Sequence, residues 1–360
     1  MTKDDPNCIE PIPVTIITGF LGSGKTTLLN AILRDPEFSR SAVLLNEFGD
    51  IQVDHDLVAD FSDELVMTTT GCLCCNASSD IKLSLFDLWE KREKGQIKAF
   101  DRVIVETTGL IDPVPVIGPL LAPSSGKTEE IVSRCFTLSR LITLFDIIFG
   151  PLTLDKYKEA GRQIGLADAI ILTKTDLAHD PATLHDIEQD KILLSGMNMG
   201  ATILDRQTDW PDIRKLFLNP TSYNLQQRSE DVLAWLDLED HQKPHDHSHN
   251  HHSHNHWETN RHDPDIFSHV IFRDEPITRS AFRQFVEWLK TNVGTDLLRM
   301  KGLIAMSDDP HRPLVVHGVQ HIIQQTEKLA KWPGDDHTTK LVLIGRNLDI
   351  EAIRLHLNES

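Results

Sequence analysis

The sequence contains no long uninterrupted hydrophobic run, and it carries much less positive than negative charge. The most apolar window, residues 131–150, is interrupted by Arg134, Arg140 and Asp146, which excludes an ordinary membrane-spanning helix. Lys and Arg number 36 against 54 Asp and Glu, for a net charge of −18. Because so acidic a chain repels a phosphate backbone, we expect no nucleic-acid partner. Because it has no membrane-spanning run, we expect no membrane partner.

Cysteine is also scarce, and the sequence shows no sign of export. The five cysteines, three of them within four positions, do not resemble the framework of a secreted disulfide-rich protein. Residues 1–6 are polar and lack the apolar core of a signal peptide. At 360 residues, with 40% hydrophobic and 25% charged side chains, the chain is long enough for two globular domains. We therefore expect a soluble, cytoplasmic, two-domain protein.

The segment GFLGSGKTT at positions 19–27 fits the phosphate-binding loop pattern G-x-x-x-x-G-K-[ST]. Residues 14–18 read as a buried strand and residues 27–33 as a helix, and this order aims backbone N–H groups at a bound phosphate. We expect Lys25 to reach the β- and γ-phosphates and the Thr26 hydroxyl to bind Mg²⁺. The predicted phosphate-binding residues are Gly19, Gly22, Ser23, Gly24, Lys25, Thr26 and Thr27.

The first 205 residues alternate short β-rich runs with helical patterns. This alternation predicts an α/β fold, a doubly wound and mostly parallel sheet of the P-loop NTPase type. The expected strands are 14–18, 42–46, 64–67, 102–106, 141–145 and 169–173, and a further helix is expected at 79–94. Doubly wound sheets bind ligands where their strands end, so polar residues at those ends are the candidates for the site.

The second half of the chain is divided by a histidine-rich run. Residues 206–240 are a connecting segment with a short helix expected at 233–238. Residues 241–262 hold nine of the 18 histidines, which predicts a disordered linker that collects metal or, alternatively, is only a solvated linker. Residues 263–360 predict a smaller α+β domain with an antiparallel sheet. Its expected elements are strands at 266–272, 303–306, 314–317 and 341–344 and a helix at 278–291.

Glu106, at the end of an apolar strand, precedes Thr107-Thr108-Gly109 and stands where a metal-associated acid would be. A carboxylate there acts at Mg²⁺, directly or by orienting a water, and Gly109 allows its backbone N–H to approach the γ-phosphate. We predict that Lys25 and Glu106 are the catalytic residues of a nucleotide hydrolase.

The segment Thr173-Lys174-Thr175-Asp176 closes another buried strand and resembles the guanine signature Asn/Thr-Lys-x-Asp. A fixed carboxylate at Asp176 accepts hydrogen bonds from N1–H and the 2-amino group of guanine, and adenine offers neither pairing. The Lys174 stem lies over the base plane in this interpretation. Thr173, Lys174 and Asp176 are therefore predicted to bind the base, which favours GTP over ATP.

Three thiols occupy four positions in Gly71-Cys72-Leu73-Cys74-Cys75-Asn76. Disulfides among them would be severely strained, and the polar flanking residues make a buried structural role unfavourable. Clustered thiolates before a helix select Zn²⁺ above all, with Co²⁺, Ni²⁺ or Cu⁺ as further candidates. Metal binding is the favoured interpretation, and redox sensing is the alternative.

Taken in order, these motifs resemble the CobW-type metal-chaperone GTPases. The matching segments are GFLGSGKTT, NEFG at 46–49, GCLCC at 71–75, ETTG at 106–109, TKTD at 173–176, LRMKG at 298–302, HGVQ at 317–320 and LIGRNL at 343–348. The resemblance implies GTP hydrolysis coupled to delivery of a transition metal, Zn²⁺ or else Co²⁺, to a client metalloprotein. It also implies metal ligation by Cys72, Cys74 and Cys75, with Cys74 and Cys75 preferred, and by Glu47 as an oxygen ligand.

The expected mechanism couples the two ligands. GTP and Mg²⁺ draw Glu47 and the thiolates into one metal-binding geometry, and hydrolysis releases the metal. No arginine finger or catalytic glutamine is assigned from the sequence, so intrinsic hydrolysis is expected to be slow. The competing functions are a GTP-dependent nickel insertase, a non-catalytic metal or redox sensor and a small-molecule kinase. A homodimer is compatible with these features.

Overall fold

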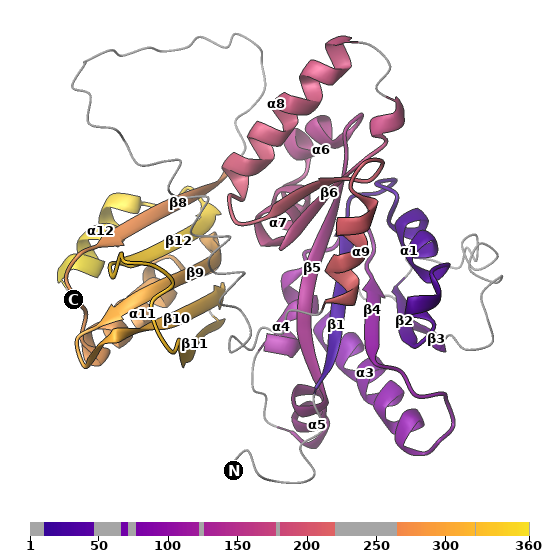
Figure 1. Ribbon diagram of the computed structural model, residues 1–360, viewed down its shortest axis with the longest axis horizontal. Coiled ribbons are helices and arrows are strands. Elements are labelled where there is room, and N and C mark those ends of the chain that lie inside the picture. Colours follow the sequence, from indigo (N-terminus) through magenta and orange to yellow (C-terminus); the bar gives the residue numbers. More distant parts are fainter. Residues whose placement is uncertain are drawn as a thin grey trace.

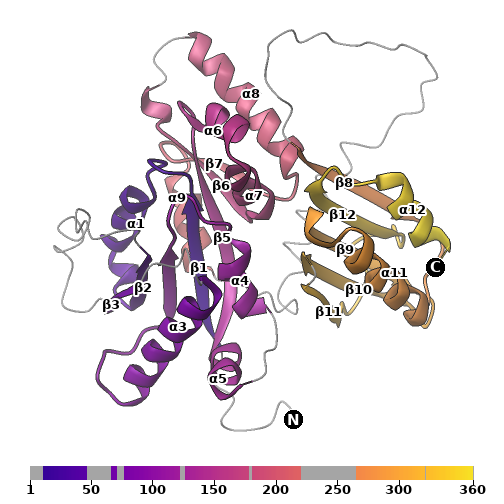
Figure 2. The same ribbon diagram turned by 180° about the vertical axis from the view of Figure 1, so that it is seen from behind.

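The computed structural model describes residues 11–46, 66–70, 77–121, 126–177, 181–219, 265–320 and 322–359. Within these residues the chain forms a larger N-terminal domain around a parallel sheet and a smaller C-terminal domain around an antiparallel sheet. The two domains lie side by side, as Figure 1 and the reverse view in Figure 2 show. The predicted fold class is confirmed.

In the described residues, seven parallel strands form the first sheet, in the order β3-β2-β4-β1-β5-β6-β7. They are β1 (Ile12–Gly19), β2 (Ser41–Asn46), β3 (Val66–Thr70), β4 (Arg102–Glu106), β5 (Phe136–Asp146), β6 (Ala169–Thr173) and β7 (Thr202–Asp205). The apolar runs of β1, β4, β5 and β6 are buried almost throughout, as expected for strands covered on both faces. Six of the seven overlap the predicted ranges, although β3 ends three residues later and β5 begins five residues earlier than expected.

Helices cover both faces of this sheet, so the fold is doubly wound. The helices are α1 (Lys25–Leu33), α3 (Ala77–Glu93), α4 (Val114–Leu121), α5 (Lys127–Cys135), α6 (Gly150–Lys156), α7 (Lys158–Leu166), α8 (Pro181–Met197) and α9 (Trp210–Leu218). Helices α1 and α9 pack with Ile17 on one face, and α3, α4, α7 and α8 pack with Ile16 on the other. Within the segment 206–240, α9 thus belongs to the core of the first domain, and the helix expected at 233–238 lies outside the described residues.

The C-terminal sheet has the strand order β11-β10-β9-β12-β8, and all neighbouring strands are antiparallel. Its elements are β8 (Ile266–Arg273), α11 (Arg279–Asn292), β9 (Leu297–Met306), β10 (Asp309–Val319), β11 (Ile322–Lys328), β12 (Thr339–Arg346) and α12 (Ile350–Glu359). Helices α11 and α12 cover one face with a shared apolar core. The sequence predicted one helix here, and α12 and β11 are additional elements.

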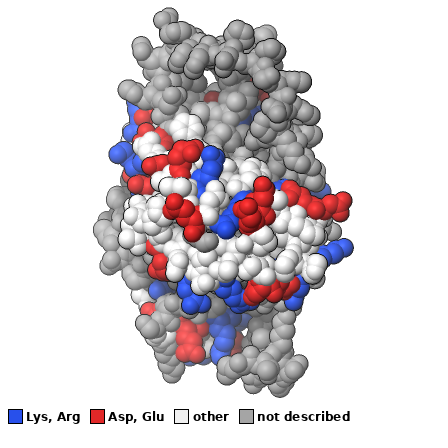
Figure 3. Space-filling model, turned by 90° about the vertical axis from the view of Figure 1, so that its left-hand side faces the viewer, with Lys and Arg blue, Asp and Glu red and all other residues white. Residues whose placement is uncertain are grey.

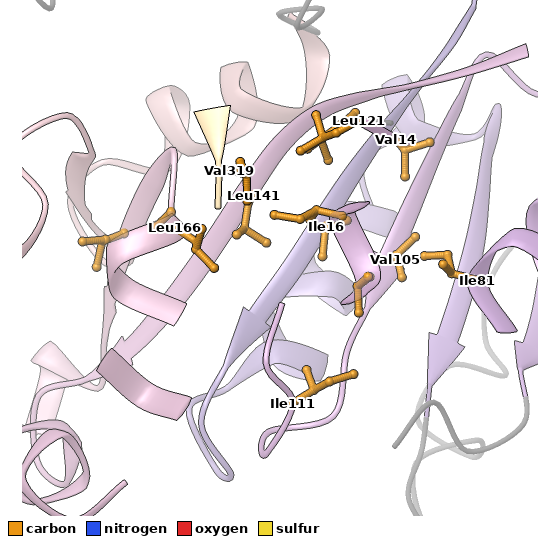
Figure 4. Packing of buried hydrophobic residues seen from close by; sticks show 14 of the residues in the cluster. Val14, Ile16, Ile81, Val105, Ile111, Leu121, Leu141, Leu166 and Val319 are labelled. Carbon is orange, nitrogen blue, oxygen red and sulfur yellow. The ribbon is translucent and has the colours of Figure 1, made fainter. Parts of the chain in front are cut away.

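The other face of the C-terminal sheet packs on the first domain. Val319 of β10 lies in the same hydrophobic cluster as Leu141 of β5 and Leu166 of α7, as Figure 4 shows. At the polar centre of the contact, the buried guanidinium of Arg299 on β9 forms an ion pair with Asp168. A buried pair is costly to break, because removal of one partner leaves the other charge uncompensated. The interface therefore fixes the second sheet firmly against the first domain.

Two observations concern the molecular surface. On the side that the C-terminal domain presents in Figure 3, acidic and basic side chains are interspersed, and neither sign gathers into a continuous patch. Among the described residues, every helix is too short or too polar to cross a membrane.

Candidate nucleotide-binding site

The phosphate loop follows β1 and leads directly into α1. Gly24 has φ +89° and caps the helix without a side-chain hydrogen bond, so α1 leaves its first N–H groups free of side-chain capping. This left-handed backbone angle favours glycine, and Gly22, with φ +73°, has the same requirement. Uncapped N–H groups at a helix N-terminus make an anion-binding position. The loop therefore has the backbone of a phosphate site.

Lys25, the first residue of α1, folds its side chain back over this loop. Its ammonium donates hydrogen bonds to the carbonyl oxygens of Gly19 at 2.8 Å and Phe20 at 3.0 Å. Burial lowers the pKa of Lys25 from 10.5 to about 8, and the negative charge of Glu106 opposes this effect in part. The charged lysine is therefore under-compensated, which favours the approach of an anion.

Thr26 and Glu106 come together although they are 80 positions apart. The Thr26 hydroxyl donates to the Glu106 carboxylate, Oε1, at 2.7 Å, and Glu106 is buried at the end of β4. A hydroxyl and a carboxylate at this distance are hard oxygen donors, the type that Mg²⁺ prefers. The pair fits a magnesium ion next to the phosphates.

The segment after Glu106 lies directly against the phosphate loop. The Thr107 backbone N–H donates to the Ile17 carbonyl at 3.0 Å, and its hydroxyl contacts that of Thr18 at 3.0 Å. A Cβ atom placed on Gly109 would lie 2.5 Å from the backbone nitrogen of Leu21. Only glycine permits so close an approach. Position 109 must therefore be glycine for this segment to lie beside the phosphate loop.

The predicted base-binding residues lie at the end of β6, of which Thr173 is the last residue, and directly after it. The Thr173 hydroxyl donates to the Ser23 carbonyl at 3.0 Å, so this residue ties the segment to the phosphate loop. Lys174 has φ +62°, and its ammonium lies 2.5 Å from the Asp146 carboxylate. Asp176, in the 3₁₀ turn Thr175–Leu177, is exposed and accepts a hydrogen bond from the Gln207 amide at 3.1 Å. The carboxylate that would accept from guanine thus already accepts from an N–H donor.

The remaining predicted phosphate-binding residues lie in the same loop and helix. Gly19 ends β1, Ser23 is buried and Thr27 is exposed in the first turn of α1. The predicted metal ligands Glu47, Cys72, Cys74 and Cys75 and the histidine-rich run 241–262 lie outside the described residues. Within the described part of the chain, no group of three His, Cys, Asp or Glu side chains is arranged to hold a metal ion.

The described strands nevertheless fix where the cysteine segment and the Glu47 segment begin. In the register of β2 with β3, Asn46 is opposite Thr70, and in the register of β2 with β4, Leu45 is opposite Glu106. The chain therefore enters residues 47–65 and 71–76 from adjacent strand ends on the edge of the sheet that carries Glu106.

Sequence reasoning missed two glutamines near these residues. Gln163 in α7 is 1% exposed and donates hydrogen bonds to the carbonyls of Gly109 at 3.1 Å and Ile111 at 3.0 Å. Gln207 follows β7 and contacts Asp176. No local pattern in the sequence marks either glutamine, because their contacts are made with residues 54 and 31 positions away.

The chain matches two family descriptions over most of its length. Residues 13–204 match "CobW/HypB/UreG, nucleotide-binding domain", and residues 266–360 match "Cobalamin synthesis protein cobW C-terminal domain". The zinc chaperone YjiA of Escherichia coli is 32% identical over 351 residues, covering 96% of this chain and 98% of that protein. The zinc-regulated GTPase metalloprotein activator 1 of Schizosaccharomyces pombe is 29% identical over 96% of this chain and 85% of its own length.

A solved structure agrees with both domains. The crystal structure of a zinc(II)-bound triple mutant of the YjiA GTPase, with one glutamate and two cysteines replaced by alanine, has a TM-score of 0.71 and 27% identity. The match covers 97% of this chain and 98% of that one. The predicted enzyme class, a P-loop GTPase, is supported by the family and by these relatives. The chain therefore belongs to the CobW/HypB/UreG family of P-loop GTPases and carries the CobW C-terminal domain.

Proposed function

We propose that this protein hydrolyses GTP slowly and uses the nucleotide to control the binding and delivery of Zn²⁺ to a client metalloprotein. The phosphates and Mg²⁺ would be bound by Lys25, Thr26 and Glu106. The guanine would be bound by Thr173, Lys174 and Asp176. When bound, Mg²⁺ neutralises charge on the β- and γ-phosphates. Glu47 and the thiolates of Cys72, Cys74 and Cys75 would bind zinc as cargo, with Co²⁺ as the alternative metal.

The observation that carries this proposal is the register of the strands. Asn46 and Thr70 are opposite each other at the ends of β2 and β3. Neighbouring strands are about 4.8 Å apart, and consecutive Cα atoms are about 3.8 Å apart. Glu47 follows one of these ends directly and Cys72 follows the other by two residues, so one ion is within reach of both segments. Because Glu106 is in register with Leu45, the same strand end borders the nucleotide site.

The relatives support the choice of metal. Two of them carry zinc in their names, and the solved structure with a TM-score of 0.71 is bound to zinc(II). That crystal still holds zinc although a glutamate and two cysteines are replaced. Any metal assay on this chain must therefore count the bound ions as well as measure affinity, because further sites are expected in a chain with 18 histidines.

The decisive experiment measures zinc affinity against a competing chelator, with the protein bound either to GTPγS with Mg²⁺ or to GDP. Nucleotide and metal must affect each other reciprocally, and a coupling of about 1–3 kcal/mol changes the affinity roughly 5–150-fold. We expect tighter zinc binding with GTPγS, and loss of that difference in the double variant Cys74→Ser, Cys75→Ser. Cys135→Ser is the matched control, since Cys135 is a free thiol of the C-terminal turn of α5.

Equal zinc affinity in the two nucleotide states would contradict the chaperone cycle. Phosphate release with and without zinc then separates a GTPase from a sensor that only binds nucleotide. Deletion of residues 241–262 should lower the number of bound zinc ions and leave one tight site; an unchanged number would mean that the histidines do not collect metal.

A further inference from the structure

Gln163 is a buried polar residue that has no role in the function derived so far. Its amide directs both N–H groups at the segment after Glu106, donating to the carbonyls of Gly109 at 3.1 Å and Ile111 at 3.0 Å. Its backbone carbonyl accepts a hydrogen bond from the Thr143 hydroxyl of β5 at 2.7 Å. A residue that is 1% exposed, with two hydrogen bonds from its side chain and one to its backbone carbonyl, has little freedom to move independently.

The segment that Gln163 holds is confined on its other side by the phosphate loop. The backbone at Gly109 approaches Leu21 so closely that a Cβ atom would lie 2.5 Å from the Leu21 nitrogen. Three residues further, Asp112 forms an ion pair with Arg162, the neighbour of Gln163 in α7. Helix α7 thus fixes residues 109–112 at both ends, with two successive side chains.

We propose that Gln163 is a positioning residue that sets Gly109 for recognition of the γ-phosphate, an inference that rests on the GTP-binding function proposed above. The Gly109 N–H and the Gly109 carbonyl belong to neighbouring peptide planes that are joined at a Cα without a side chain. Holding the carbonyl restricts the φ and ψ angles of Gly109, and with them the direction of its N–H. A donor aligned in advance stabilises a developing or bound anion more than one that must be ordered by the ligand. GDP lacks the γ-phosphate and is therefore insensitive to this alignment.

Helix α7 is in turn seated on the C-terminal domain. A Cβ atom on Gly165 would lie 3.0 Å from the Leu298 side chain of β9, and one on Gly161 would lie 3.0 Å from Ile266 of β8. Arg299 donates to the carbonyls of Leu166 and Ala167 at 2.7 Å, at the end of the helix. The alignment of Gly109 therefore depends on a helix whose opposite face rests on the second domain.

The test compares Gln163→Met with the wild-type full-length protein. Methionine has a similar length and removes both donors. We expect the affinity for GTPγS to fall at least about fivefold while the affinity for GDP stays within about twofold, measured by competition with a fluorescent GDP analogue. Steady-state hydrolysis should show a lower kcat as well. A residue that only supports the fold would lower both affinities equally.

Asn198→Leu is the matched control. Asn198 in the turn after α8 is fully buried and donates through its amide to the carbonyls of Ile164 at 2.8 Å and Ala167 at 2.9 Å. It makes the same kind of bond to the same helix without contacting residues 109–112. Its loss should lower stability in urea and leave the ratio of GTPγS to GDP affinity unchanged.

If Gln163→Met does not fold, Arg162→Leu carries the test, because Arg162 is partly exposed and holds the same segment through Asp112. We expect a smaller change of the ratio in the same direction. A folded variant with the wild-type ratio would overturn the role of Gln163 and leave the proposed function intact. Failure of the wild-type protein to bind GTPγS would contradict the proposed function itself, and this role with it.

Discussion

Nucleotide binding should take up a proton at Lys25, and the structure gives the size of the effect. Burial lowers the pKa of this lysine from 10.5 to about 8 in the free protein. The difference corresponds to roughly 3 kcal/mol that disfavours the ammonium form. Phosphates placed beside the ammonium raise the pKa again, because opposite charges favour the charged form. Binding therefore draws about half a proton at pH 8 and about a tenth of a proton at pH 7.

The sign of the pH dependence follows directly. The ammonium binds phosphate, and the free protein loses that charge as the pH rises through about 8. Between pH 7 and about pH 8.5 the Kd for GDP should rise about fourfold. The effect of Lys25 on folding stability in the absence of nucleotide has the opposite pH dependence. The unfolded chain keeps the proton up to about pH 10.5, whereas the folded protein loses it near pH 8. The free energy of unfolding therefore increases as the pH rises from about 8.

Isothermal titration calorimetry with GDP checks this prediction. Titrations at pH 7 and pH 8 in two buffers of different ionisation enthalpy give the number of protons taken up. Lys25→Arg is the control, because a guanidinium stays charged throughout this range and its binding should be independent of pH. The reasoning is refuted if the wild-type protein takes up no proton at pH 8, or if the arginine variant shows the same slope.

Three further changes test other parts of the structure. Gly109→Ala should cost about 1–3 kcal/mol of stability and weaken GTPγS binding, because its Cβ would lie 2.5 Å from the Leu21 nitrogen; unchanged urea midpoint and affinity would contradict the close contact. Arg299→Met should cost about 3–5 kcal/mol in urea unfolding, since it leaves buried Asp168 without its main counter-charge, and the added change Asp168→Asn should restore part of the loss. Asp176→Asn should lower the affinity for GDP roughly tenfold and shift the preference toward a xanthine nucleotide in a competition binding assay. A variant that retains the preference for guanine would show that other residues recognise the base.

Much of the nucleotide site could be predicted from the sequence because its signals are local. The glycines of the phosphate loop are required by the backbone angles of a few consecutive residues, as Gly24 shows. Strand ends such as Glu106 and Thr173 are marked by a change from apolar to polar residues within the strand itself. The order of these motifs along the chain also led to the family, and that prediction is confirmed by the match over both domains.

What the sequence did not give depends on residues far apart in the chain. The contact of Gln163 with Gly109 spans 54 positions, and the contact of Arg299 with Leu166 spans 133. Neither residue carries a local pattern that distinguishes it from an ordinary helix or strand residue. Helix α12 was missed for a related reason, since its buried residues Ile353 and Leu357 leave only a short apolar stripe at the end of the chain. Packing partners, rather than propensity, define these features.

The segment 107–112 is where the two ligands of the proposed cycle would meet. It continues β4, whose Glu106 is in register with Leu45 of β2, and β2 leads into the segment that carries Glu47. On its other side it is bonded to Gln163, and through α7 it reaches the second domain. A γ-phosphate bound at Gly109 would therefore act on two neighbouring parts of the structure. One is the end of β2, which leads to the proposed metal ligands, and the other is α7, which contacts the C-terminal sheet. Packed elements shift between discrete arrangements and do not deform gradually. A small displacement of residues 107–112 is therefore sufficient to change the position of both the end of β2 and α7.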